Sequence, residues 1–504
     1  MMMQDVILKK LGLKVSGTYE EKYFRLQKFA EYQGITVNEL FKLLTKEENP
    51  CFIPIRKFGV ELEGGIPLQK RDFAALLRQE GIPAEVTGYY HDIVPHFKVG
   101  SDSSVSVPDL FPVEITSPQL IGLGNSGSGF KEVEKLLEIW NRELHAAGIE
   151  SAVNRSCGGH IHVDVYDYSL KDLIQLYLLF YGTWELIKFL IPPSRRKNYR
   201  YCRPIGERDF EEFFIGNGYI SNRYVALNSA NFRDKHVEFR FWPGTTLSRK
   251  LKMHLIVSLC FVEAVKKGKT IWQLLQEVEA KGKDRIEIED LLDFLEIRGE
   301  HPVLKEVREY AIKRYYHFWN TAEEDKVEAE IGISLNYVWN SLFKVVETVV
   351  LAFLKNLANF EISRFWNEKR LTFPNFRFRE NVAVKIWQTL EVRENLFEFY
   401  YNRRRRRVRV DLKNLEEESN KVLSIVRDIW TVFYFFEISE KVWEKLVELR
   451  NGVEERRINE NDDEVEVIEN EVDEAEVVDV EERERTAADI LEEMLSEGLL
   501  TMSA

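Results

Sequence analysis

The 504-residue sequence has little cysteine, and its four cysteines form no Cys-x-x-Cys pair. Without such a pair a thiolate zinc site is not expected, and a few scattered cysteines in so long a chain fit a reducing compartment. The N-terminal residues lack a long apolar core and a small-residue cleavage site, which predicts no signal peptide. We therefore expect a cytoplasmic protein.

Long apolar runs and an excess of positive charge are also missing. The longest apolar stretch, between Asp172 and Glu185, falls short of the ~20 residues that a helix needs to cross a bilayer. We expect no membrane contact. The formal net charge of −14 argues against a protein that coats nucleic acid, although it leaves room for a local basic patch.

The length and the changes in composition predict five parts. They are an N-terminal helical module at 1–50, a strand-rich region at 51–268, a helical region at 269–452, an acidic disordered linker at 453–485 and a short terminal helix at 486–504. The linker has no aromatic residue and cannot bury enough apolar surface to offset its chain entropy. The tethered terminal helix is typical of a docking peptide for a protein partner, with a frayed tail as the alternative.

Two segments outside the strand-rich region leave alternatives open. Apolar residues from Phe24 to Tyr32 precede a stop at Gly34, and Thr36 begins a second helix. This helix pair is an N-terminal packing element or, alternatively, a DNA-reading unit. The run Arg403–Arg407 is a solvated helix face or a patch for an acidic partner, with a nucleic-acid contact as the alternative.

The strand-rich region mixes two kinds of pattern. Short runs with period-2 alternation are separated by Gly, Pro and Ser turns, and they predict strands. Helices are expected from about Val133 to Gly148, from Leu170 to Leu190, and after Thr246. Because the second helix is apolar nearly all round, we expect it to be buried. Locally pairing strands with helices inserted between them indicate an α+β fold rather than a doubly wound parallel sheet.

Three of the predicted strands share a chemical pattern. Alternate side chains of a strand point to opposite faces, and each strand carries two chemical groups on one face and apolar residues on the other. The pairs are Glu61 and Glu63 in KFGVELEG, His160 and His162 in CGGHIHVD, and Glu238 and Arg240 in HVEFRF. If these strands lie in one sheet, six polar groups line a single concave surface.

Carboxylates dominate this set, and hard oxygen ligands suit Mg²⁺ or Mn²⁺. Same-face neighbours on a strand are ~6.5–7 Å apart, so Glu61 and Glu63 serve two neighbouring ions more easily than they chelate one. Two cations beside an arginine form a site for polyphosphate. Each pair alone is also common on a solvated surface, so the prediction depends on the three pairs occurring together.

Further polar candidates fall between these strands. They are Asp102 and Ser103 in a turn after a predicted strand at His96–Val99, Glu114 in PVEITSP, Arg195, Arg196 and Arg200 after Pro192-Pro193, and Arg223 and Asn228 in NRYVALN. The fork of an arginine suits bidentate contacts to phosphate or carboxylate. The arginines are therefore candidates for binding ATP phosphates and an acidic substrate.

The order of the motifs GVELE, DSS, VEITSP, SCGGHIHV, PPSRR, RYVALN and HVEFRFWPGT resembles the amidoligase family. That family is placed in the superfamily of glutamine synthetase and glutamate–cysteine ligase. The resemblance covers about residues 53–265 and implies a glutamine-synthetase-like curved, mostly antiparallel sheet that holds metal and ATP. It makes residues 51–268 the catalytic domain, and it leaves the rest of the chain unassigned.

The resemblance also implies roles for single residues. The implied metal ligands are Glu61, Glu63, Glu114, His160, His162 and Glu238. The implied catalytic residues are Arg240, Arg223 and Arg195, and the implied nucleotide-binding residues are Arg240, Arg195, Arg196, Asn228 and Ser103. The implied cofactors are ATP and Mg²⁺ or Mn²⁺. The reaction would join a carboxylate to an amine through an acyl phosphate, on a peptide or protein substrate.

Two other classes of function stay open. A metal-dependent hydrolase would use the His-x-His strand to activate water, and it would act without ATP. A non-catalytic binding or scaffold protein would keep the ligase fold in degenerate form, with partners at the N-terminal helices, the arginine run or the terminal helix. A homo-oligomer also stays open. The identity of the substrates, the general base and the oligomeric state cannot be predicted from the sequence.

Overall fold

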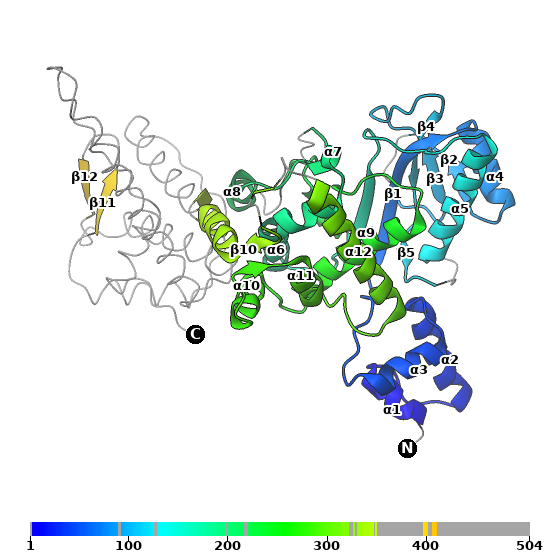
Figure 1. Cartoon of the computed structure of the whole chain (residues 1–504), viewed down its shortest axis with the longest axis horizontal. Helices are drawn as coiled ribbons and strands as arrows, with labels where there is room; N and C mark the ends of the chain where they lie inside the picture. Colours follow the sequence, from blue (N-terminus) through cyan, green and yellow to red (C-terminus); the bar gives the residue numbers. More distant parts are fainter. Residues whose placement is uncertain are drawn as a thin grey trace. The chain divides into compact units, whose positions relative to one another are not determined.

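The computed structural model describes residues 3–349, except 89–91, 125–128, 197–199, 216–219, 322–325, 328–329, 347 and some side chains, together with 397–401 and 406–410. The chain divides into two compact units. Figure 1 shows the described helices and strands, coloured along the sequence. Unit 1 comprises Met1–Ile205 and Ile220–Leu335, and unit 2 comprises Gly206–Tyr219 and Asn336–Ala504. The domain boundaries predicted at residues 50, 268 and 452 do not coincide with this division and stay predictions.

Unit 1 begins with three helices, α1 (Met3–Lys10), α2 (Tyr19–Tyr32) and α3 (Val37–Lys46). Helix α3 begins with a capping box, in which the Thr36 hydroxyl accepts from the backbone of Glu39 and the Glu39 carboxylate accepts from the backbone of Thr36. The three helices share a small apolar core of their own. The predicted helices and the Thr36 cap are confirmed, whereas DNA reading stays an untested alternative.

One mixed sheet forms the centre of unit 1. Its strands are β1 (Lys57–Ile66), β2 (Ala84–Val86), β3 (Phe97–Gly100), β4 (Phe111–Thr116), β5 (Leu120–Ile121), β6 (Gly159–Asp164), β7 (Leu227–Asn228) and β8 (His236–Phe239). The order is β2-β3-β4-β1-β6-β8-β7, with β5 paired to β1. Only β2 and β3 pair in parallel among these described strands. The predicted α+β class is confirmed.

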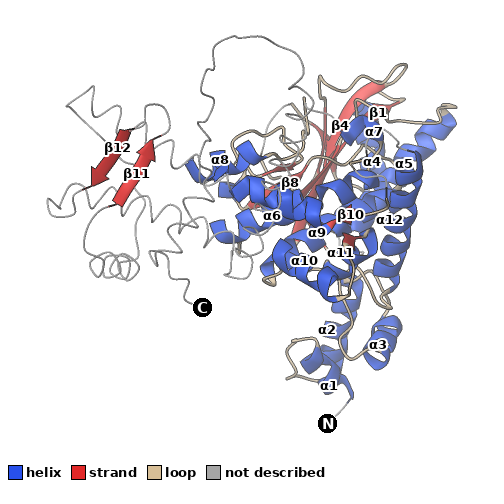
Figure 2. Ribbon diagram, turned by 60° about the vertical axis from the view of Figure 1, so that its left-hand side comes forward, coloured by secondary structure: helices blue, strands red, loops and turns tan. Residues whose placement is uncertain are grey.

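Helices cover the apolar face of this sheet (Figure 2). The covering helices are α5 (Phe130–Ala146), α6 (Leu170–Ile187) and α9 (Ser248–Lys266). Strand residues such as Val60, Ile161 and Val237 are fully buried, whereas the charged residues between them point to the opposite face. The sheet therefore presents its polar pairs on the side away from the apolar core.

The apolar stretch that contains α6 is longer than the sequence predicted. Residues Leu170–Leu190 are long and apolar enough to cross a membrane by length and composition alone. However, 89% of the apolar window is buried inside the protein. This segment, α6 with the short 3-10 helix η1 (Lys188–Leu190), packs as a core helix, as its all-round apolarity predicted.

The remaining elements are mostly helical. In unit 1 they are α4 (Lys70–Gln79), α7 (Pro193–Arg196), η2 (Phe232–Asp234), α10 (Ile271–Ala280), α11 (Ile288–Phe294), α12 (Pro302–Thr321) and the short strands β9 (Arg285–Ile286) and β10 (Ile333–Ser334). Unit 2 contains α8 (Glu207–Ile215) and the paired strands β11 (Phe397–Tyr401) and β12 (Arg406–Val410).

The prediction of a helix face for the arginine run is wrong where the structure describes it. Arg406 and Arg407 lie in strand β12, in antiparallel register with β11. Phe399 lies opposite Val408, and such aromatic and β-branched pairs favour a strand over a helix. Residues 403–405, the acidic linker and the terminal helix lie outside the described residues.

A buried arginine connects distant parts of unit 1. Arg56 is 5% exposed; its guanidinium donates to both Asp167 oxygens at 2.8 and 3.1 Å and to Glu263 Oε2 at 2.9 Å. The Tyr32 hydroxyl accepts from the Arg56 backbone N–H at 3.1 Å. Arg56 thereby joins α2, the loop after β6 and helix α9.

Replacing Arg56 with alanine should lower the free energy of unfolding by about 3 kcal/mol, the lower end of the range for a broken buried ion pair, because both carboxylate partners are partly exposed. Urea denaturation measures this loss. Arg142→Ala is the matched control, since Arg142 pairs with Glu80 and Glu143 on the exposed surface of α5. Equal losses in the two variants would contradict the role assigned to Arg56.

Candidate active site

Strand pairing brings the three predicted polar pairs together. Glu61 on β1 lies opposite His160 on β6, and His162 lies opposite Glu238 on β8. Glu63 lies opposite Glu114 on the other side of β1. The central strands thus place these groups next to one another on the polar face of the sheet.

The first cluster consists of Glu61, His162 and Glu238. One ligand atom of each residue lies within 4.8 Å of the other two. His162 Nε2 is 3.1 Å from Glu61 Oε1, and His160 Nδ1 is 2.9 Å from Glu61 Oε2 and 3.2 Å from Glu238 Oε1. The cluster offers two carboxylates and an imidazole, a donor set that accommodates Mg²⁺ or Mn²⁺.

The second cluster consists of Glu63, Asp102 and Glu114, whose ligand oxygens also lie within 4.8 Å of one another. It offers oxygen donors alone, which suit a hard cation. His160 lies beside both clusters, because its Nε2 is 3.6 Å from Glu63 Oε1. Glu61 and Glu63 belong to different clusters, which agrees with the strand spacing that favours two ions over one chelated ion.

Asp102 was not among the predicted metal ligands. Strand register explains why Asp102 lies in this cluster, since Gly100 at the end of β3 pairs with Glu114 on β4. The turn that follows β3 therefore passes close to the Glu114 carboxylate. The DSS motif was the available signal, but only the neighbouring Ser103 was predicted as a binding residue, and Ser103 is exposed in this turn.

Charge compensation differs between the clusters. Burial raises the pKa of Glu61, but the charge of His162 and hydrogen bonds from both histidines outweigh burial and hold this pKa well below its ordinary value. Burial likewise opposes the net lowering of the Glu238 pKa, which follows from His162, His160 and Arg240. Burial, followed by the charge of Glu61, raises the pKa of Glu114 to about 7. Around Glu114 the charges of Glu61, Glu63 and Asp102 therefore outweigh the opposing charge of His160.

This excess of negative charge predicts a pH dependence of the metal-free protein. Glu114 binds its proton more tightly in the folded state than at the ordinary pKa of 4.5. Its contribution to stability is complete below pH 4.5 and is lost as the pH rises through about 7. In EDTA, Glu114→Gln should flatten the fall of the melting temperature between these pH values. The exposed control Glu138→Gln should retain the wild-type slope, and an unaltered slope in Glu114→Gln would contradict the prediction.

Two buried arginines lie beside the first cluster. Arg240 Nη1 donates to Glu238 Oε1 at 2.5 Å, and Arg195 Nη2 donates to the Arg240 carbonyl at 2.9 Å. Asn228 Nδ2 donates to Glu238 Oε2 at 2.7 Å. Arg195 is 4% exposed, and its Nε has no hydrogen-bond partner among the described residues. A buried guanidinium with an unsatisfied donor fits a phosphate oxygen.

Gly158, two residues before His160, keeps space open between the clusters. A Cβ atom on Gly158 would lie 3.0 Å from His160 Nε2 and 3.2 Å from both Arg195 Nη2 and Glu63 Oε2. The Gly158 backbone N–H donates to Glu63 Oε2 at 2.5 Å. A side chain here would crowd the groups that could hold a cation and a phosphate. The residues present therefore fit both groups.

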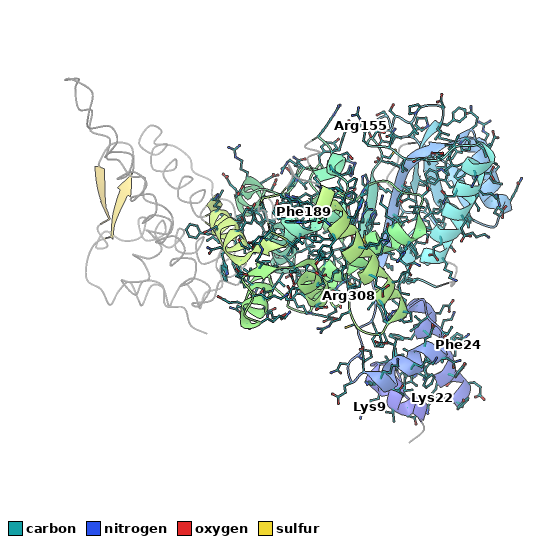
Figure 3. All side chains as sticks on the ribbon, viewed as in Figure 1. Lys9, Lys22, Phe24, Arg155, Phe189 and Arg308 are labelled. Atoms are coloured by element: carbon teal, nitrogen blue, oxygen red, sulfur yellow. The ribbon has the colours of Figure 1, made fainter. Side chains whose placement is uncertain are left out.

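The structure does not bring Arg196 to these clusters. Its Nε donates to the carbonyls of Lys188 and Ile191, and its guanidinium lies over the rings of Phe189 and Phe318 at 4.7 and 5.3 Å. Phe189 lies among the helices of unit 1 (Figure 3). These contacts place Arg196 in the helical core and not at the two clusters, and its binding of nucleotide stays a prediction.

Arg223 also lies apart from the carboxylates. It is exposed in the segment before β7, with its guanidinium 5.8 Å from the ring of Tyr224. The guanidinium of Arg240 lies 5.9 Å from the same ring. The structure therefore places Arg223 outside the buried site, next to a residue that contacts Arg240.

Comparisons with known proteins agree with the resemblance. Residues 54–262, less than half of the chain, match a family model described as "Putative amidoligase enzyme". No curated protein matches the chain. Among solved structures, the chain is similar to the crystal structure of the complex between the prokaryotic ubiquitin-like protein Pup and its ligase PafA, with 11% identity and a TM-score of 0.22 over 84% of this chain and 99% of that chain. A likeness at this TM-score supports no argument, whereas the family match confirms the resemblance seen in the ordered motifs.

Proposed function

We propose that this protein is an ATP- and Mg²⁺-dependent carboxylate–amine ligase that forms an amide or isopeptide bond. The observation that carries the proposal is the pair of adjacent carboxylate clusters beside two buried arginines. The match of residues 54–262 to the amidoligase family supports the same reaction class. A peptide or protein substrate in the cytoplasm belongs to this proposal.

The clusters suit the first half of such a reaction. Glu61, His162 and Glu238 would hold one divalent cation, and Glu63, Asp102 and Glu114 would hold a second. Bound cations would offset the charge that develops on a transferring phosphoryl group. Arg240 and Arg195 are buried and preorganised next to the first cluster, so they would bind phosphate oxygens without a large cost in side-chain entropy.

The proposed reaction has two steps, phosphoryl transfer and amide formation. A carboxylate oxygen of the substrate attacks the γ-phosphorus of ATP, the bond to the β-phosphate oxygen breaks, and ADP leaves. The amine nitrogen then attacks the acyl carbon, phosphate leaves with the electron pair of its C–O bond, and the nitrogen loses a proton. The first step needs the cations and arginines, which is why we place it at the two clusters.

Intact-mass analysis tests this proposal. The full chain is incubated with Mg²⁺, ATP, hydroxylamine as a small amine, and a peptide pool that carries Asp, Glu and C-terminal carboxylates. The expected product is a peptide that gains hydroxylamine and loses one water, together with ADP and phosphate. Peptide cleavage without ATP would favour a hydrolase, and no turnover under any condition would favour a binding protein; either outcome contradicts the ligase.

A further inference from the structure

A cavity of about 310 Å³ is lined by residues of α5, of the start of α9 and of α12. This volume is at the lower end of the ~300–1,000 Å³ that small-molecule pockets occupy. None of the lining residues belongs to the two carboxylate clusters. The cavity is therefore separate from the candidate active site and has room for a small ligand of its own.

Apolar residues form part of the cavity wall. They are Leu137, Leu247 and Tyr310. Leu247 is 61% exposed, although its side chain is large and apolar. A ligand with an apolar part would remove this surface from water, which is favourable by ~25 cal/mol for each Å². The wall therefore favours a ligand that is partly apolar.

Two of the charged residues in the wall have partners of opposite charge. Glu134 Oε1 lies 3.1 Å from Lys252 Nζ, and Arg249 Nε lies 3.4 Å from Glu306 Oε1. These charges are balanced within the protein, so they do not select the charge of a ligand.

Lys250 has no such partner. It is half-buried, and it forms no ion pair with a carboxylate among the residues that the structure describes. Burial, followed by the charge of Arg314 on α12, lowers the pKa of Lys250 to about 8. His254, one turn later in α9, is fully buried, and neither of its ring nitrogens has a hydrogen-bond partner in the described part of the chain. The charge of Lys250 is therefore left for a ligand to balance.

The start of α9 adds hydrogen-bond donors to the same side of the cavity. This helix has 19 residues and no acidic residue in its first turn, and its N-cap residue Leu247 has no side-chain acceptor. The first backbone N–H groups of a helix have no partner within the helix, and they favour a negative group. Lys250 and these N–H groups together fit a carboxylate.

Glu138 supplies the opposite charge on the wall that α5 forms. It is exposed, and it makes no ion pair with another described residue. Asn141 lies three residues later on the same face of the helix. Its Nδ2 donates to the Thr246 carbonyl at 2.8 Å, so its Oδ1 remains as an acceptor. This wall therefore fits an ammonium group.

We propose that this cavity binds a free α-amino acid with an apolar side chain. The carboxylate of the ligand lies at Lys250 and the start of α9, its ammonium lies at Glu138, and its side chain lies against Leu247. A simple anion would leave Glu138 without a partner, and a simple cation would leave Lys250 without one, whereas a zwitterion satisfies both. The inference goes beyond the proposed ligase function and does not depend on it.

Isothermal titration of the full chain at neutral pH, without ATP or Mg²⁺, tests this site. The probes are L-leucine and L-phenylalanine. Each is compared with the acid that lacks its ammonium (isocaproate or hydrocinnamate) and with the amine that lacks its carboxylate (isoamylamine or phenethylamine). At least one of the two amino acids should bind at least about tenfold more tightly than either of its analogues, because each analogue lacks one charged contact.

Two variants assign the binding to this cavity. Lys250→Met removes the charge but keeps an unbranched side chain, and it should weaken amino-acid binding at least about tenfold and abolish the advantage over the amine. Glu138→Gln should weaken binding similarly and abolish the advantage over the acid. Because Glu138 is exposed, this second variant should fold even if Lys250→Met does not. The control Lys131→Met changes an exposed lysine of α5 outside the cavity and should bind like the wild type.

Three results would overturn the proposal. The first is that neither amino acid binds at millimolar concentration. The second is that an acid or amine analogue binds as tightly as its parent amino acid. The third is wild-type affinity in Glu138→Gln or in folded Lys250→Met, with folding verified by the melting temperature.

Discussion

Glu238→Gln should reduce the affinity for ATP in the presence of Mg²⁺ at least about 100-fold. Changes to residues that support a metal ligand cost about 10- to 100-fold, and a change to the ligand itself should cost no less. Glu238 is 3% exposed and lies against His160, Arg240 and Asn228. The amide keeps the size of the side chain and can still accept from Asn228, so the fold should persist. The loss would therefore reflect the missing negative charge at the first cluster. Isothermal titration with a non-hydrolysable ATP analogue measures it.

Glu61→Gln should behave in the same way, because Glu61 contacts both histidines of β6. Glu85→Gln provides the control, since Glu85 is an exposed carboxylate on β2 of the same sheet. Circular dichroism and melting temperature verify that each variant is folded. Unchanged nucleotide affinity in folded Glu238→Gln and Glu61→Gln would count against the first cluster as a cation site.

Arg240→Lys should lower kcat by about 100- to 1000-fold, the range found when one preorganised donor of a transition-state site is removed. Lysine retains the charge but lacks the planar fork that contacts Glu238 Oε1 and the Tyr201 carbonyl. Its ammonium could therefore not hold both the carboxylate and a phosphate oxygen in fixed geometry. The rate of ADP release in a single turnover measures the effect on phosphoryl transfer. The reaction contains hydroxylamine and the peptide substrate that the intact-mass analysis identifies.

Arg196→Lys is the informative comparison for this variant. Arg196 is as deeply buried as Arg195, but its described contacts are with Lys188, Ile191 and two phenylalanine rings. We expect a lower melting temperature and an unchanged kcat in the folded fraction. A large fall in kcat for Arg196→Lys, with none for Arg240→Lys, would reverse the assignment of the two arginines.

The period-2 pattern of single strands predicted most of the site. In an extended strand the spacing of side chains is fixed locally, so the shared face of Glu61 and Glu63 needs no knowledge of the rest of the fold. The apolar partners Val60, Ile161 and Val237 then fix which face is buried. The order of strands in the sheet was not predictable from this pattern and came only through the resemblance.

Positions in turns and short helices were harder to predict. Asp102 reaches the second cluster through the turn after β3, whose path depends on the pairing of β3 with β4. Arg195 and Arg196 are adjacent in the one-turn helix α7, and successive helical side chains diverge by about 100°. One arginine can therefore face the sheet while its neighbour enters the helical core, and the sequence does not say which.

The arginine run illustrates a different limit. Five consecutive charged residues have no apolar periodicity, so helix and strand could not be distinguished from the run itself. The signal lay in the flanking residues, where Phe399 and Val408 alternate with polar neighbours in both strands of the hairpin. Cross-strand pairing thus decided a structure that local charge left open.

The most direct test of the central claim is the number of divalent cations that bind together with nucleotide. Electron paramagnetic resonance of the full chain with Mn²⁺ and a non-hydrolysable ATP analogue should detect two bound ions that are magnetically coupled. Glu63→Gln should remove one ion and the coupling, because Glu63 belongs to the second cluster alone. A single uncoupled ion in the wild type, or two ions retained in both Glu61→Gln and Glu63→Gln, would contradict a two-cation site on this sheet.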